Sequence, residues 1–356
     1  MSIDRILIIR FSSLGDIILL TPLFRETRKR FPGSQIDFLT STSFASVCRN
    51  NPNINNIIAL DRKKGNRELN RVVEKIKQTD YDLILDGHQS LRSRLLLFKL
   101  FGIFGRLKKH IGLIDKRSIK RNILLLTKIN LLKTAVSQRE AYCQLLNPFC
   151  EDKLYDTSTE LFPSKEDNNA VLDILHQSKT EGKTIIALGP SASFSGKCWP
   201  KEYFLELTNR FIERGFIVLL LGGPDDKEPN WIEENISKLV LNLAGKLSYL
   251  ETAAILKYCS LSISNDSAIV HFAEAVKVPA FAIFGPTVKE FGYAPYRRNS
   301  RIFEIQLPCR PCSRNGKGDC KITLKRQCLK NISVESVWEQ ACRLLEKKRD
   351  YNDLTF

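Results

Sequence analysis

A phosphate-binding site is predicted at the stretch LSISNDSAIVHFAEAV, residues 261–276. An apolar strand pattern ends at Asn-Asp-Ser, and the apolar spacing of a helix begins at once. Asp266 or Ser267 can cap that helix, whose first amides, including that of Ala268, would bind an anion together with the helix dipole. His271 lies one turn further on the face of Ser267. The junction suits a diphosphate, and a plain helix cap beside a core histidine is the alternative.

Three other apparent strands end in residues that suit the same ligand. Gly189 ends one strand and Ser191 follows it, and Lys197, further along that loop, can neutralise a phosphate. The turn at 222–228 carries acids that can accept hydrogen bonds from ribose, and Thr287 is expected to be exposed after another strand. Because parallel strands end at one edge of a sheet, these residues predict a nucleotide site. No G-x-G-x-x-G follows a strand and no G-x-x-x-x-G-K-[ST] occurs, which argues against a dinucleotide cofactor and a P-loop ATPase.

A candidate general base lies near the start of the chain, in RFSSLGD. A strand pattern ends at Arg10, and a small-residue loop follows, in which Ser13 and Gly15 are candidates for acceptor contacts. Asp16 then opens a helix pattern, where a carboxylate is stabilised as the anion. A helix cap is the simpler interpretation. At the carboxyl edge of a sheet, facing a nucleotide site, Asp16 would instead take the proton of an acceptor hydroxyl.

Two more polar groups flank the strand pattern at 82–86. Asp80 and Asp82 resemble a metal-binding D-x-D pair, but they lie where the strand starts, which favours a structural role. His88 and Arg92 follow the strand at its carboxyl edge and are candidates for acceptor contacts. A helix cap is again the alternative.

Strand and helix patterns alternate along the chain and restart after a polar stretch at 156–169. This predicts an α/β fold of two Rossmann-like domains, each a doubly wound parallel sheet. We expect an N-terminal acceptor domain at 1–155, a C-terminal nucleotide domain at 170–333 and a last helix within 334–356 that packs across both. Pro22 either kinks the first helix or marks its start. The expected strands are 5–10, 35–39, 56–60, 82–86, 184–189, 216–223, 240–245, 261–264 and 280–285, and the expected helices are 43–50, 67–78, 90–101, 201–214, 229–237, 249–258, 267–276 and 334–348.

The net charge of +16 is concentrated in the first part of the chain. Residues 1–150 contain 27 Lys and Arg against 12 Asp and Glu, whereas residues 151–356 contain 28 against 27. The stretch 106–133 is the most basic, and Lys109 and Lys120 within it are candidates for acceptor contacts. Such a surface suits nucleic acid, anionic lipid or a phosphorylated saccharide. A nucleic-acid-binding protein without enzymatic activity is an alternative, but no binding motif or regular aromatic spacing accompanies the charge.

Hydropathy and cysteine usage predict a cytoplasmic protein. The sequence contains no run of 18 or more uncharged apolar residues, the length that a membrane-spanning helix needs. MSIDRILIIRFSS is a strand pattern rather than a secretory leader. Six scattered cysteines are then reduced thiols. The other four follow the spacing C-x2-C-x7-C-x7-C at Cys309, Cys312, Cys320 and Cys328. They indicate a structural zinc or iron site, with unliganded thiols or a disulfide as alternatives.

Together these segments resemble glycosyltransferase family 9, the bacterial lipopolysaccharide heptosyltransferases. The matching segments, in the family's order, are IRFSSLGDIILLTPLFRETRKRFPGSQIDFLT, YDLILDGHQSLRS, GPSASFSGKCWPKEYF, LGGPDD and SNDSAIVHFAEAVKVPAFAIFGPT. The resemblance implies a GT-B fold, with two Rossmann-like domains facing across a cleft, in a Gram-negative bacterium. It also implies inverting, metal-independent transfer of heptose from ADP-heptose to the inner core of lipopolysaccharide, at the inner face of the cytoplasmic membrane.

By position, the resemblance makes Asp16 the base that deprotonates the acceptor and Lys197 the group that stabilises the departing diphosphate. The residues that would hold the donor are Asp266, Ser267, Ala268 and His271, with Ser191 assisting. The family usually has glycine where this chain has Ala268, so another nucleotide sugar or acceptor is an alternative. The expected partners are an ADP-sugar, an anionic lipopolysaccharide-core acceptor and an anionic membrane surface, and no nucleic acid.

Overall fold

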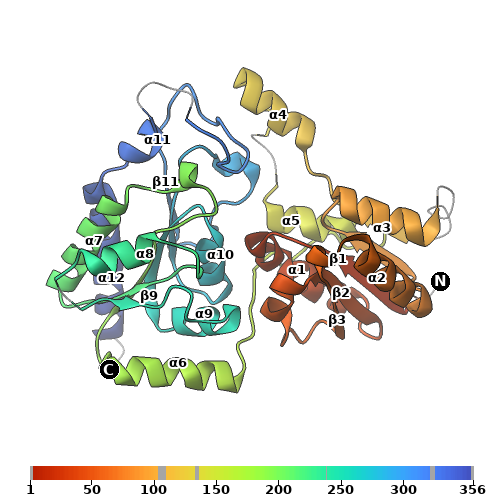
Figure 1. Cartoon of the computed structure of the whole chain (residues 1–356), viewed down its shortest axis with the longest axis horizontal. Helices are drawn as coiled ribbons and strands as arrows, with labels where there is room; N and C mark the ends of the chain where they lie inside the picture. Colours follow the sequence, from red (N-terminus) through yellow and green to blue (C-terminus); the bar gives the residue numbers. More distant parts are fainter. Residues whose placement is uncertain (1–2, 103–109, 133–135, 238, 321–324, 354–356) are drawn as a thin grey trace. The chain divides into compact units, whose positions relative to one another are not determined.

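The computed structural model describes residues 3–102, 110–132, 136–237, 239–320 and 325–353. The chain forms two compact units (Figure 1). The first contains Met1–Ser118 and Val136–Phe162, and the second contains Ile119–Ala135 and Pro163–Phe356. None of the helices in these described ranges combines the length and apolarity needed to cross a bilayer.

The first unit is built on a five-stranded parallel sheet in the order β3-β2-β1-β4-β5. Its strands are β1 (Arg5–Ile9), β2 (Gln35–Ser41), β3 (Asn56–Leu60), β4 (Leu83–Asp86) and β5 (His110–Leu113). The order of connection reverses between β1 and β4. The carboxyl ends of these two strands therefore border the crevice where such sheets bind ligands.

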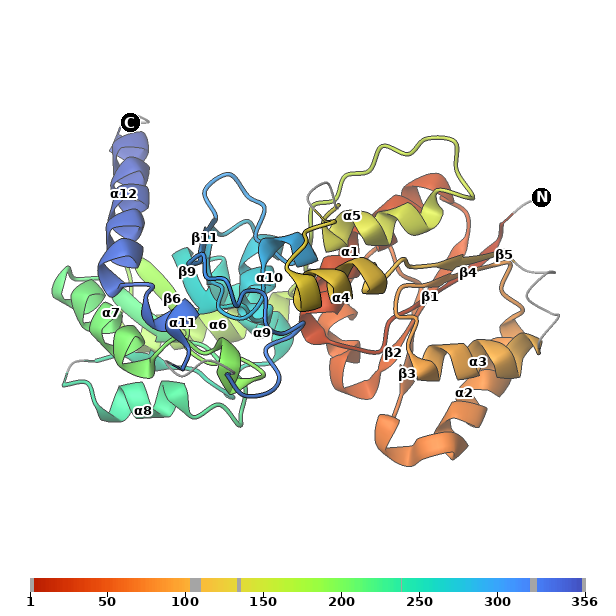
Figure 2. The same ribbon diagram turned by 90° about the horizontal axis from the view of Figure 1, so that it is seen from above.

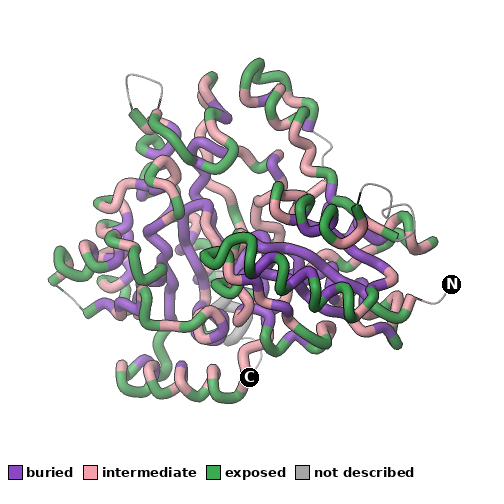
Figure 3. The backbone as a smooth tube through the Cα atoms, turned by 45° about the vertical axis from the view of Figure 1, so that its right-hand side comes forward, coloured by how far each residue is buried: buried purple, intermediate pink, exposed green. Residues whose placement is uncertain are grey.

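Helices cover both faces of this sheet, so its central strands are largely buried (Figure 3). Figure 2 shows α1 (Leu14–Arg30) and α5 (Gln138–Cys143) on one face, and α2 (Gly65–Thr79) and α3 (Leu91–Phe101) on the other. Short 3-10 turns are η1 (Thr42–Cys48), η2 (Arg62–Lys64) and η4 (Gln144–Leu146). The helix expected at 43–50 is thus a 3-10 segment.

Pro22 lies inside α1, which begins at Leu14 rather than after Thr21. A proline has no amide hydrogen, so the carbonyl of Ile18, one turn back, loses its helical donor. The hydroxyl of Thr21 donates to this carbonyl at 2.8 Å. This local replacement explains how the helix continues through the proline to Arg30.

The second unit is built on a six-stranded parallel sheet in the order β11-β10-β9-β6-β7-β8. Its strands are β6 (Ile185–Gly189), β7 (Ile217–Leu220), β8 (Leu241–Asn242), β9 (Cys259–Asn265), β10 (Ala280–Ile283) and β11 (Arg301–Phe303). The order of connection reverses between β6 and β9, which places the second expected crevice at the carboxyl ends of these strands.

The helices of the second unit lie on both faces of its sheet (Figure 2). They are α6 (Lys165–Gln177), α7 (Lys201–Glu213), α8 (Glu228–Glu234), α9 (Tyr249–Leu256), α10 (Ala268–Ala275), α11 (Gln327–Lys330) and α12 (Val334–Asp353), with 3-10 turns η5 (Ser195–Lys197) and η6 (Lys289–Phe291). The last helix, α12, packs on α7, and its Val337 and Ala341 join the same core as Phe211.

The helix α4 (Ser118–Thr127) precedes α5 in the sequence, yet its neighbours belong to the second unit. Leu124 and Leu132 form a small buried cluster with Phe291. Beyond the helix, Lys128 donates to the carbonyl of Pro311 at 2.6 Å. The chain therefore enters the second unit at α4 and returns to the first at α5.

Candidate functional site

Asp16 lies in the first turn of α1, directly beyond the carboxyl end of β1. Its buried Oδ2 accepts hydrogen bonds from the Ser13 hydroxyl at 2.7 Å and the Ser13 amide at 3.2 Å. Oδ2 also forms an ion pair with Nη2 of Arg10 at 2.9 Å, and Tyr142 of α5 donates its hydroxyl to Oδ1 at 3.1 Å. Ser13 is the N-cap of α1 and Asp16 is the third residue of the helix, so the two residues form a capping box that stabilises the start of α1.

These partners keep Asp16 charged. Burial alone would raise the pKa of its carboxyl group, but Arg10 and the hydrogen bonds from Ser13 and Tyr142 outweigh burial and lower the pKa to about 2. The carboxylate is therefore ionised at neutral pH, as a proton acceptor must be. Arg10 is fixed in turn by a 2.6 Å hydrogen bond to the carbonyl of Gly87, which follows β4.

His88 lies on the same sheet edge, after β4. The amide of Phe11 donates to Nδ1 of His88 at 3.0 Å, so the neutral ring carries its proton on Nε2. Burial, with smaller effects from Arg10 and Lys116, lowers the pKa of His88 to about 3. Asp86 accepts from the His88 amide at 2.8 Å and so holds the turn. A neutral imidazole in this position can donate to a hydroxyl but does not act as a cation.

We expect the stability of the first unit to fall in weak acid because of His88. The unfolded chain binds a proton near pH 6.5 and the folded ring only near pH 3, so stability is full above pH 6.5 and decreases as pH falls below it. Between pH 7 and pH 5 the loss should be about 1–2 kcal/mol. Urea unfolding of His88→Gln at both pH values should show a smaller loss than the unchanged protein. The exposed His176, changed to Gln, is the matched control, and equal losses in all three proteins would contradict the prediction.

The other acceptor candidates are spread over both units. Gly15 is in the first turn of α1, and Arg92 is in the first turn of α3. Lys120 is exposed on α4, within the second unit. Lys109 lies outside the described residues. The structure therefore groups only part of this set at the sheet edge of Asp16.

The structural interpretation of Asp82 is confirmed. Its Oδ2 accepts hydrogen bonds from the amides of Asp4 and Arg5, each at 2.9 Å, and so joins the start of β4 to the start of β1. Asp80 ends α2 in a left-handed conformation with φ 49°. Asp82 thus has a structural role at the edge where these two strands start.

In the second unit, Lys197 is paired with Asp266 just beyond β9. Nζ of Lys197 lies 2.7 Å from Oδ2 of Asp266 and donates to the Asp266 carbonyl at 2.9 Å. These side chains are only 15% and 10% exposed. Thr287, which we expected to be exposed, is buried, because its hydroxyl donates to the same Oδ2 at 2.8 Å. The structure thus places Lys197 and Asp266, two of the residues expected at the nucleotide site, in contact, with the ammonium charge offset by a carboxylate.

Ser267 is the N-cap of α10, which begins at Ala268. The Ser267 hydroxyl accepts a long hydrogen bond of 3.4 Å from the amide of Ile269. The helix start therefore lies at the carboxyl end of β9, beside β6, where its dipole favours an anion. His271 is buried within this helix.

Gly189 is the last residue of β6, on the other side of this crevice, and Ser191 follows two residues later. A Cβ atom at Gly189 would lie 2.8 Å from the Cβ atom of Ser264 and 3.2 Å from Ile269, so close packing of β6, β9 and α10 explains this glycine. The buried Ser191 donates its hydroxyl to Glu228 at 2.7 Å. Glu228 is therefore linked to the site by its hydrogen bond with Ser191.

The four-cysteine segment packs against the site. A side chain at Gly316, where φ is 83°, would collide with the methylene groups of Lys197. Burial raises the pKa of Cys312, and the neighbouring Cys309 and Cys320 contribute to the rise. Among the described residues, no three His, Cys, Asp or Glu side chains form a group that could hold a metal ion. The zinc or iron site stays a prediction.

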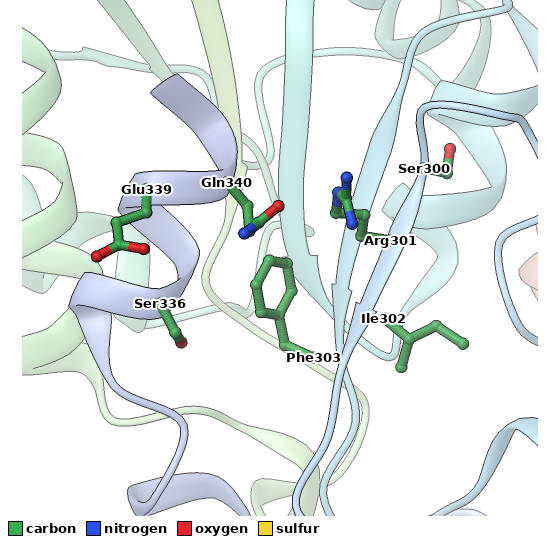
Figure 4. Close-up of a pocket in the computed structure, with 7 residues that line it drawn as sticks. All are labelled: Ser300, Arg301, Ile302, Phe303, Ser336, Glu339 and Gln340. Atoms are coloured by element: carbon green, nitrogen blue, oxygen red, sulfur yellow. The ribbon is translucent and has the colours of Figure 1, made fainter. Parts of the chain in front are cut away.

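A separate pocket lies between β11 and α12 (Figure 4). Its volume is about 540 Å³, and its lining residues are Ser300, Arg301, Ile302, Phe303, Ser336, Glu339 and Gln340. None of the predicted site residues is among them. We therefore place the candidate site at the strand ends and not in this pocket.

Known proteins are similar along the whole chain. The model of glycosyltransferase family 9 (heptosyltransferase) matches residues 69–322. Lipooligosaccharide heptosyltransferase 2 of Campylobacter jejuni is 27% identical over 343 residues, which are 94% of this chain and 96% of that protein. A family 9 glycosyltransferase structure from Veillonella parvula superposes with a TM-score of 0.79, at 22% identity over 98% of this chain and 99% of that chain. For E. coli ADP-heptose lipopolysaccharide heptosyltransferase II the TM-score is 0.73, at 21% identity over 97% and 99%. These structures confirm the predicted GT-B fold.

Proposed function

The chain belongs to glycosyltransferase family 9, the heptosyltransferases, and from this premise we propose that it transfers heptose from ADP-heptose to the inner core of lipopolysaccharide with inversion. The observation that carries the mechanism is Asp16, a buried and ionised carboxylate at the carboxyl edge of the first sheet. An inverting transfer needs a base that takes the proton of the acceptor hydroxyl. It also needs a positively charged group that stabilises the negative charge of the leaving diphosphate.

In the proposed reaction, Asp16 accepts the proton of the acceptor hydroxyl as its oxygen attacks the anomeric carbon. The bond from that carbon to the diphosphate oxygen breaks, and ADP leaves with the electron pair. Arg10, Ser13 and Tyr142 hold the carboxylate in position and keep it ionised. Position then matters more than basicity, because correct placement of the reacting groups lowers the barrier by itself.

Lys197 and the start of α10 would receive the diphosphate. The ammonium group is directed to the end of β9 by Asp266, and the helix begins two residues later at Ala268. Both supply positive potential where negative charge develops on the leaving group. No metal is needed for this route, and a zinc or iron ion in the four-cysteine segment would be structural.

We further propose that the acceptor and its membrane are recognised through charge. The inner core of lipopolysaccharide carries acidic sugars and phosphates, and residues 1–150 have a large excess of Lys and Arg. The cytoplasmic, peripheral location expected from the sequence follows from this proposal, since the acceptor is anchored in a lipid bilayer.

A donor screen by thermal shift tests the nucleotide specificity. We expect ADP and ADP-heptose to raise the melting temperature by several degrees when present at about 100 times their dissociation constants, because binding then stabilises the folded state by about 2.7 kcal/mol. UDP and GDP sugars should have little effect. No stabilisation by any ADP compound would contradict the proposal. Stabilisation by ADP-glucose above ADP-heptose would favour the alternative donor that Ala268 suggests.

A further inference from the structure

The exposed apolar side chains of this protein are concentrated in one part of the sequence. Of eleven large apolar residues that are exposed in the described ranges, eight fall between residues 91 and 131. Single exposed apolar residues are common on protein surfaces, whereas a group of them points to a binding surface. Three of the eight lie on one helix, α3, in the first unit.

The helix α3 has two apolar faces. Leu96 and Leu97 are buried in the core of the first unit, so they account for the packing of α3 on its sheet. On the outer face, Leu91, Leu95 and Phe98 are 86%, 38% and 50% exposed. Their spacing of four and three residues places them on one stripe of the helix. The fold does not require this second stripe.

The outer stripe is flanked by cations. Arg92, Arg94 and Lys99 are on the same helix, and its eleven residues include no Asp or Glu. At 100° per residue, Arg94 lies on one side of the stripe and Arg92 and Lys99 lie on the other. An apolar stripe between basic side chains is the pattern by which a helix lies in the interface of an anionic bilayer.

The start of α3 is also close in sequence and structure to the candidate acceptor edge. Leu91 follows His88 by three residues, and Lys116 donates to the carbonyl of Gln89 at 2.8 Å in the same turn. A bilayer under α3 would therefore meet the first unit next to the sheet edge that carries Asp16.

We propose that the outer face of α3, formed by Leu91, Leu95, Phe98, Arg92, Arg94 and Lys99, docks this protein on the surface of an anionic lipid bilayer. The inference rests on the proposed function only in so far as the acceptor is lipid-anchored. Docking would bring the acceptor edge of the first unit to the membrane surface.

Co-sedimentation of the full chain with lipid vesicles tests the proposal. Phosphatidylcholine vesicles that contain phosphatidylglycerol should bind the protein, and vesicles of phosphatidylcholine alone should bind it at least tenfold more weakly. The variant with Leu91→Gln, Leu95→Gln and Phe98→Gln should bind anionic vesicles at least tenfold more weakly, since Gln keeps the helix propensity of Leu but not its apolar surface. Arg94→Gln and Lys99→Gln should each reduce binding roughly fivefold at low salt.

Two matched controls separate this face from exposed apolar surface in general. Leu154 and Leu239 are 83% and 75% exposed outside α3, and their change to Gln should leave vesicle binding unaltered. Equal binding by the α3 variant and the unchanged protein, with the variant folded by circular dichroism, would overturn the proposal. A dimer in sedimentation velocity that the α3 changes convert to a monomer would also overturn it, because the stripe would then be a contact between copies.

Transfer to a delipidated core oligosaccharide distinguishes a failure of docking from a failure of the proposed function. The α3 variant should release ADP with this water-soluble acceptor at the rate of the unchanged protein. If neither protein transfers heptose, the proposed function fails and the vesicle result still decides the docking surface. If the α3 variant loses transfer to the soluble acceptor, the outer face contacts the saccharide and the docking proposal is wrong.

Discussion

Asp16→Asn is expected to lower kcat for heptosyl transfer by about two to four orders of magnitude and to leave ADP binding intact. The amide cannot accept the acceptor's proton, and it also removes the negative charge that pairs with Arg10 at 2.9 Å. The side chain keeps nearly the same shape: its one amide oxygen can still accept from the Ser13 hydroxyl, and its amide nitrogen can donate to the Tyr142 hydroxyl. ADP release with a core-deficient lipopolysaccharide acceptor measures the rate, and thermal shift with ADP measures the nucleotide binding.

Two controls separate the base from its surroundings. Tyr142→Phe removes one hydrogen-bond donor and leaves the carboxylate, so it should lower kcat far less than Asp16→Asn does. Asp156→Asn changes a surface carboxylate of the same unit that pairs with Arg25 at 3.3 Å, and it should leave kcat unchanged. Near-normal turnover by Asp16→Asn would show that Asp16 does not take part in proton transfer and only stabilises the start of α1.

The parallel sheets were predictable because central strands such as β1 and β6 are buried on both faces and therefore appear as continuous apolar runs. The edge strands β5 and β11 were not predicted. β5 is exposed at both ends, and β11 has three residues and no fully buried one, so neither contains such a run. Pro22 was ambiguous for a different reason. The hydroxyl of Thr21 replaces the lost helical donor, and no periodicity in the sequence reports that bond.

The chemistry of the two strand ends was predictable from residue types at strand–helix junctions, but the pairing of those residues was not. Tyr142 reaches Asp16 across 126 positions of the sequence, through the packing of α5 on α1. Thr287 appeared exposed because a polar residue in a turn usually is, and the structure buries it against Asp266. In the sequence, Glu228 is one of several acids in the same turn, and only the structure shows that it accepts a hydrogen bond from the hydroxyl of Ser191. Such contacts depend on which elements are adjacent in the fold.

Lys197→Met should lower kcat for heptosyl transfer by about two to three orders of magnitude, because the leaving diphosphate loses its cation in a site with little solvent. Among the residues that the structure describes, the same change leaves the nearly buried carboxylate of Asp266 with the Thr287 hydroxyl as its one close side-chain donor, so it should also destabilise the second unit by about 3 kcal/mol. The rate is measured by ADP release, and the free energy of unfolding is measured in urea. Lys201→Met, which removes a lysine packed 3.9 Å over the ring of Trp231, is the matched control and should retain the rate.

The double variant with Lys197→Met and Asp266→Asn separates the two effects. Replacing the carboxylate by an amide removes the unpaired buried charge and keeps an oxygen for the Thr287 hydroxyl, so much of the lost stability should return. Transfer should not return, because no cation is restored near the start of α10. If the rate recovers together with the stability, Lys197 acts only by neutralising Asp266, and the diphosphate must be held by the helix start and the loop after β6 alone.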